Sequence, residues 1–275
     1  MENLFIYFIK ACGLIGLFYF AYILLLRKET FFNSNRWFLL AGLITAAILP
    51  LFFITKIIWV EPTPTNIDWA TIQITTTAIK KEIEINWYLF FAIIYVIGFL
   101  FLTIKFLLDL YSLKKVLQNK TVQQHSDFKF INVRENIAPF SFFNYIVYNS
   151  ELYNKTELDN ILEHEKVHGA QNHTLDVLIS RLFTIIFWFN PFIWLYKKAM
   201  IQNLEFIADN EASKKIADKK AYQMTLLKIT TYQNCIAITN HFYQSLIKKR
   251  IIMLNQNQSN QRNSWKYAAI VPALI

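Results

Sequence analysis

Charged residues and cysteines are scarce in this sequence. Charged side chains make up only 17% of its 275 residues, whereas hydrophobic residues reach 55%. Cys12 and Cys235 form neither a C-x-x-C pair nor a disulfide framework, which argues against a cysteine metal site and against a disulfide-stapled secreted fold. So few charges among so many apolar residues are typical of a chain that crosses a membrane.

The charge that is present is mostly positive, with a net value of +9. In a membrane protein an excess of lysine and arginine marks cytoplasmic loops. The basic region Lys197–Arg262 is not interleaved with aromatic residues in a recognised nucleic-acid module. Nucleic-acid binding is therefore the weakest of the functions considered, and we expect no direct nucleic-acid partner.

Three apolar segments are long enough to cross a bilayer, which takes about 20 residues; they are Leu4–Leu26, Trp37–Thr55 and Trp87–Leu110. The first lacks a basic leader and a cleavage site, so we expect a retained span and not a signal peptide. Arg27, Lys28 and Arg36 lie around the short loop between the first two spans. Positive charge there predicts a cytoplasmic loop, with the N-terminus outside.

The segment between Val116 and Ser150 has a different pattern. Phe128–Val133 alternates in part, and Phe142–Tyr148 is aromatic and β-branched, so both runs predict strands. An extended peptide could add to the second strand, although a buried core strand explains the pattern equally well. A helix is predicted to start at Thr156, because Thr156-Glu157-Leu158-Asp159 resembles a capping box with Asp in place of Glu.

This predicted helix carries the sequence His164-Glu165-Lys166-Val167-His168. Residues four apart leave the same face of a helix, so His164 and His168 can bind one zinc ion. Glu165 can then act as general base toward the water that the metal activates. Two surface histidines are the ordinary alternative, but the chain has only five histidines, which makes this spacing a rare coincidence.

A catalytic zinc needs three protein ligands and one open position. His173 would lie off the ligand face if the helix continued, so we favour Glu205, although an acidic solvated helix face is the ordinary interpretation of its segment. Asp209, one turn later, could orient a ligand histidine from behind. Tyr222 and His241 are available as donors to an oxyanion, and nothing in the sequence selects either.

Between the two halves of this site lies the apolar stretch Leu175–Tyr196. A single membrane crossing would place Glu205 about 30 Å from the histidines, too far to share a metal. Asn190-Pro191 interrupts the stretch, and proline breaks a helix. We therefore expect a re-entrant or interfacial helical hairpin that returns the chain to the cytoplasmic side.

Taken together, the three spans, the HEKVH helix and the runs FWFNPFIW and EFIADNEA resemble the BlaR/MecR family of membrane metallopeptidases, which are antibiotic-sensor signal transducers. The resemblance implies a gluzincin-type site with His164, His168 and Glu205 as ligands and Glu165 as base. It also implies cytoplasmic cleavage of the sensor itself and of a transcriptional repressor. The two S-x-x-K runs lack their S-D-N and K-T-G companions, so we do not expect β-lactam sensing.

The expected fold is that of a mainly α membrane protein with an α+β gluzincin-like zinc peptidase domain. We assign residues 1–110 to a three-span region with an outer loop at about 60–86, residues 111–264 to a cytoplasm-facing peptidase domain, and residues 265–275 to the start of a further span. The expected setting is the bacterial inner membrane, with a protein as substrate. The sequence allows an oligomer but does not determine the oligomeric state. The alternative is a non-enzymatic signalling or scaffold protein with a structural zinc.

Overall fold

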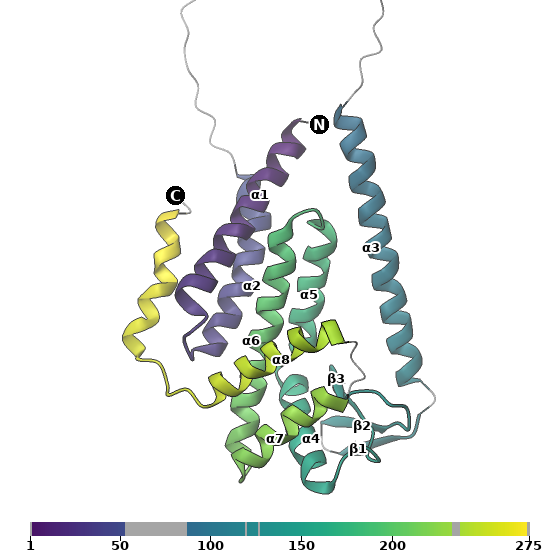
Figure 1. Ribbon diagram of the computed structural model, residues 1–275. Helices are drawn as coiled ribbons and strands as arrows, with labels where there is room; N and C mark the ends of the chain where they lie inside the picture. The colour runs from purple at the N-terminus through teal and green to yellow at the C-terminus, as the bar shows by residue number, and fades with distance from the viewer. Residues whose placement is uncertain (1, 53–86, 119, 126, 233–236, 274–275) are drawn as a thin grey trace, which may run out of the picture.

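The computed structural model describes residues 2–52, 87–118, 120–125, 127–232 and 237–273. It is predominantly helical, with a small sheet at one end of the molecule (Figure 1). The predicted outer loop at about 60–86 lies outside the described residues.

Each of the three predicted spans contains a long helix within the described residues. They are α1 (Glu2–Ala21), which continues as a π-helical turn (Tyr22–Leu26), α2 (Phe32–Ile48), which ends in a 3-10 turn (Leu49–Leu51), and α3 (Trp87–Leu117). Each is long and apolar enough to cross a membrane. α1 and α2 lie side by side, whereas α3 stands on the other side of the central helices (Figure 1).

The predicted helical hairpin is present, and it packs against α1 and α2. It consists of α5 (His173–Ile186) and α6 (Pro191–Lys215), which run in opposite directions (Figure 1). Asn190 caps α6, because its Oδ1 accepts the N–H of Phe192 at 2.9 Å, and Pro191 occupies the first helical position, where a missing N–H costs nothing. The hairpin therefore brings Glu205, in the second half of α6, back to the end of the molecule where the two histidines lie. Its insertion into a membrane stays a prediction.

The hairpin is fixed to α2 by close packing. The hydroxyl of the fully buried Tyr196 donates to the carbonyl oxygen of Leu39 at 2.7 Å. A Cβ at Gly42 would lie 2.5 Å from that hydroxyl oxygen, so only glycine lets α6 approach α2 this closely. The apolar side chains of α1, α2 and α6 form one core, which joins the predicted membrane region to the rest of the protein.

The sheet contains β1 (Val122–His125), β2 (Phe128–Asn132), β3 (Phe140–Phe142) and β4 (Tyr145–Tyr148), in the order β1-β2-β4-β3. β2 and β4 pair in parallel, and the outer pairs are antiparallel. The prediction of a single strand over Phe142–Tyr148 is wrong. Phe143 adopts a left-handed conformation, with φ of 49°, and this turn separates β3 from β4.

This correction changes which strand an added peptide could use. β4 is paired on both sides, by β2 and by β3, so its backbone groups are already occupied. β3 lies at the edge of the sheet. An edge strand presents unpaired N–H and C=O groups along its free side.

Helix α4 (Lys155–Ala170) begins one residue before the predicted start, and its cap differs from the prediction. Asn154, not Thr156, is the capping residue: its side chain accepts the N–H of Glu157 at 2.8 Å, and Glu157 accepts the N–H of Asn154 at 3.0 Å. This box has the preferred glutamate at its third position, where a cap at Thr156 would offer aspartate.

Three further elements follow the hairpin: α7 (Lys219–Tyr232), α8 (Ala237–Leu254) and a 3-10 segment (Gln261–Ala273). α7 and α8 lie across the face of α4 and α6 (Figure 1). Tyr267 and Ile270 of the last segment pack into the core of α1 and α2. That this segment starts a further span stays a prediction.

Candidate metal centre

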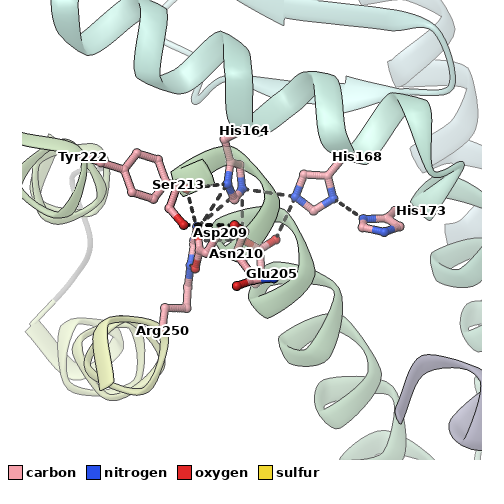
Figure 2. Close-up of polar contacts among 9 residues, drawn as sticks. All are labelled: His164, His168, His173, Glu205, Asp209, Asn210, Ser213, Tyr222 and Arg250. Carbon is pink, nitrogen blue, oxygen red and sulfur yellow. Dashed lines mark hydrogen bonds and ion pairs between the residues drawn. The ribbon is translucent and has the colours of Figure 1, made fainter. Parts of the chain in front are cut away.

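The three predicted ligands converge at the crossing of α4 and α6. One donor atom from each of His164, His168 and Glu205 lies within 4.8 Å of the others (Figure 2). The two Nε2 atoms are 3.2 Å apart. Glu205 places Oε2 3.4 Å from Nε2 of His164 and Oε1 3.6 Å from Nε2 of His168. The four-residue spacing on α4 and the hairpin together produce this convergence.

The proton on His164 can be assigned from its neighbours. The Tyr222 hydroxyl donates to Oδ1 of Asp209 at 2.7 Å, so its oxygen is free to accept from Nδ1–H of His164, which lies 2.9 Å away. A neutral imidazole with its proton on Nδ1 carries its lone pair on Nε2. That lone pair points to His168 and Glu205. Asp209 lies behind His164: its Oδ1 is 3.3 Å from Nδ1 of His164 and also accepts the hydrogen bond from Tyr222.

The donor set fits a divalent metal ion. His168 also uses Nδ1 for an outward bond, to Nδ1 of His173 at 2.9 Å. Two acceptor nitrogens 3.2 Å apart, beside a carboxylate, repel one another unless a cation or a proton lies between them. Two imidazoles and one carboxylate are a ligand set that catalytic zinc sites use. Among the described residues, this is the one such cluster of histidine, cysteine, aspartate and glutamate side chains.

Arg250, on α8, joins the site without having been predicted. Its Nη1 lies 2.8 Å from Oε2 of Glu205, and its Nε and Nη2 donate to Asp209 at 2.8 and 2.6 Å. Nη2 is also 3.4 Å from Nε2 of His164. In the sequence Arg250 ends the run Lys248-Lys249-Arg250, which resembles any solvated basic helix face. Its role depends on how α8 packs against α6, and no local pattern reports that.

The electrostatics of the site favour ionised carboxylates. Burial raises the pKa of Glu205, but Arg250 and the two histidines lower it more, so the net pKa lies well below its usual range. The same balance of burial against Arg250 lowers the pKa of Asp209 to about 2. Burial lowers the pKa of His164, but hydrogen bonds to the carboxylates of Asp209 and Glu205 raise it by more, so that the net pKa is about 9. In the absence of metal, a proton on His164 therefore balances this charge, and binding of a metal ion at Nε2 has to displace that proton.

Glu165 lines a cavity of about 200 Å³ next to the three ligands. His164, Glu205 and Arg250 line the same cavity, as does Pro139, which immediately precedes β3. The predicted base and the residue that precedes the edge strand therefore line one space. Tyr222 also lines it, but its hydroxyl is engaged by Asp209 and His164. The His241 side chain lies outside the described part of the chain.

Within its described residues the protein has three membrane-length helices and a His/His/Glu cluster next to a small sheet, and these are features of a membrane metallopeptidase. The model of the family described as BlaR1 peptidase M56 matches residues 13–254. The chain belongs to this family, which confirms the resemblance found in the sequence. The family implies peptidase activity and a metal cofactor. No curated protein matches the chain.

Proposed function

We propose that the chain is a zinc endopeptidase that transmits a signal across the bacterial inner membrane by cutting itself, a cytoplasmic transcriptional repressor, or both. His164, His168 and Glu205 would hold the metal, and Glu165 would be the catalytic base. The observation that carries the proposal is the meeting of two imidazole nitrogens and one ionised carboxylate beside a cavity that Glu165 lines.

Bound to these ligands, zinc would supply Lewis-acid activation of water and of the scissile carbonyl. Glu165 takes the proton of the attacking water and returns a proton to the leaving amine. Asp209 and Tyr222 keep the ring of His164 turned toward the site. Arg250 balances the charge of the part-exposed Glu205 and of the buried Asp209, so that neither carboxylate lacks a cation.

The free edge of β3 is the place where an extended substrate would bind. A peptide that pairs with Phe140–Phe142 gains main-chain hydrogen bonds without requiring a particular side chain. Because Pro139 lines the cavity, such a peptide runs directly past Glu165. Edge pairing therefore presents a peptide bond to the base.

Charge distribution supports a cytoplasmic site. Lys114 and Lys115 lie in the last turn of α3, at the end of this helix that adjoins the sheet (Figure 1). The short loop after α1, with Arg27 and Lys28, lies toward the same end of the molecule (Figure 1). Positive flanks mark the cytoplasmic ends of membrane helices. This orientation gives the site access to cytoplasmic proteins and puts the N-terminus outside.

The test combines metal content with cleavage of the full-length protein in detergent. We expect the wild type to bind one zinc per chain and to produce cleavage fragments. Glu165→Gln should keep the zinc and lose cleavage, because only the base is removed, whereas Glu205→Ala should lose both. Glu163→Gln is the matched control, since this part-buried glutamate of α4 pairs with Lys166 outside the cluster, and it should keep both.

Two outcomes contradict the proposal. A wild type without stoichiometric metal would remove the basis of the chemistry. Zinc in the wild type, with Glu165→Gln fully active in signalling and His164→Ala inactive, would instead indicate a scaffold with a structural metal.

A further inference from the structure

A line of hydrogen bonds connects the second apolar helix to the ligand His168. Arg36 of α2 donates from Nη1 to Oε1 of Gln171 at 3.5 Å and from Nη2 to the Gln171 carbonyl oxygen at 2.9 Å. Nε2 of His173 lies 3.3 Å from the same Oε1. Nδ1 of His173 lies 2.9 Å from Nδ1 of His168 (Figure 2).

The direction of each bond in this line follows from the arginine. Because a guanidinium only donates, the Gln171 side-chain atom that Nη1 meets is the amide oxygen Oε1 and not the amide nitrogen. Nε2 of His173 must then donate to that oxygen, so a neutral His173 accepts at Nδ1. The proton between the two rings therefore belongs to Nδ1 of His168. Nε2 of His168 is left with its lone pair, and this is the atom that faces His164 and Glu205.

The turn between α4 and α5 brings His173 to this position. α4 ends at Ala170, and Asn172 adopts a left-handed conformation with φ of 53°, so the helix does not continue. His173 opens α5 with only 2% of its surface exposed. The sequence prediction that His173 is not a ligand agrees with this geometry, but its premise of a continuing helix is wrong. The ring contacts the back of a ligand instead.

The far end of the line is held firmly. Nη2 of Arg36 also forms an ion pair with Oδ2 of Asp176 at 2.7 Å, and the side chains are 13% and 3% exposed. Arg36 lies in the first turns of α2, next to the loop that follows α1. A shift of α2 therefore changes the position of the Gln171 oxygen to which His173 donates.

We propose that His173 is a positioning residue that fixes His168 in the tautomer able to bind metal, and that Arg36 anchors His173 through Gln171. The inference rests on the proposed metal site at His164, His168 and Glu205. It adds a route by which a membrane helix controls one ligand. Outer partners that fix the proton of a ligand histidine are worth about 10- to 100-fold in metal affinity.

The experiment measures Co²⁺ affinity and the Co²⁺ absorption spectrum of the full-length protein in detergent. His173→Leu removes the acceptor and should weaken Co²⁺ binding about 10- to 100-fold, with a changed spectrum. His173→Asn keeps a carbonyl acceptor and should restore affinity to within a few-fold of the wild type. His125→Leu, at an exposed histidine on β1, is the matched control and should change neither measurement.

Gln171→Leu tests the same line without altering the buried ring. It should weaken Co²⁺ binding, and the double variant with His173→Leu should lose little more than His173→Leu alone, because both act through one chain of bonds. Equal loss in His173→Leu and His173→Asn, or no loss in either, would overturn the proposal. A wild type that binds no Co²⁺ would overturn the metal site itself, and this result is read before any variant.

Discussion

Asp209→Ala is the substitution whose effect on stability follows most directly from the structure. Asp209 is 1% exposed, and its carboxylate accepts two bonds from Arg250 and one from Tyr222. Removing one partner of a buried ion pair costs about 3–5 kcal/mol, because the other charge stays buried without compensation. Arg250 keeps Glu205 at 2.8 Å, so we expect a loss near the lower end, about 3 kcal/mol.

The loss is large enough to measure on the intact protein. For a chain of this size, 1 kcal/mol corresponds to about 2–4 °C in Tm, so Asp209→Ala should lower the Tm by about 6–12 °C. The measurement is thermal unfolding of the chelator-treated protein in detergent, followed by near-ultraviolet circular dichroism. Asp209→Asn keeps two acceptor lone pairs and should fall between the wild type and Asp209→Ala.

The double variant Asp209→Leu/Arg250→Met separates the proposed cause from a loss of packing. It removes the unpaired charge together with the carboxylate, and apolar replacement of a buried ion pair is often neutral. Glu205 then loses its cation, but its side chain is 28% exposed and can be solvated. We therefore expect the double variant to recover most of the lost Tm. If it unfolds at a lower temperature than Asp209→Ala, the buried guanidinium is not the source of the loss and the reasoning fails.

Three further predictions concern pH, packing and metal removal. Burial raises the pKa of Glu157, but the Lys228 ammonium and the Asn154 N–H lower it more. The ionised Glu157 therefore stabilises the fold above the ordinary carboxyl pKa, and this stabilisation is lost as the pH falls through the lowered pKa. Glu157→Gln should cost about 0.5–1 kcal/mol of unfolding free energy at pH 7 and nothing in strong acid. Gly42→Ala should destabilise by about 1–3 kcal/mol, whereas Gly13→Ala, with nothing within 4 Å of its Cβ, should unfold like the wild type. Free zinc at 100 times its Kd should raise the unfolding free energy by about 2.7 kcal/mol, an increase that a chelator abolishes and that Glu205→Ala never shows.

Local patterns in the sequence were sufficient to predict those features of the site that lie within a single helix or turn. The helical period places His164 and His168 on one face, and Asn190-Pro191 marks the hairpin turn. The requirement for a third ligand then selected Glu205. The left-handed turn at Phe143 was missed, because a phenylalanine gives no sign that its φ is positive. That omission merged two strands into one.

Arg250 was not predicted, and Tyr222 was named only as a candidate donor to an oxyanion; their actual contacts were missed for a different reason. Arg250 and Tyr222 reach the site from α8 and α7, and the geometry that aligns them exists only after these helices pack on α4 and α6. In the sequence, each is an ordinary basic or aromatic residue of an amphipathic helix. Contacts between residues this far apart depend on the tertiary structure, to which no local propensity refers.

The Nδ1 atoms of the two ligand histidines contact different residues. His164 depends on Asp209 of α6 and on Tyr222 of α7. His168 depends, through His173, on Arg36 of a membrane-length helix. Each ring can bind metal through Nε2 only while its proton stays on Nδ1. Disturbing the residues that contact one Nδ1 would therefore weaken that ligand first. A displacement of α2 would therefore act on the proposed metal site through His168, and a displacement of α7 would act on it through His164.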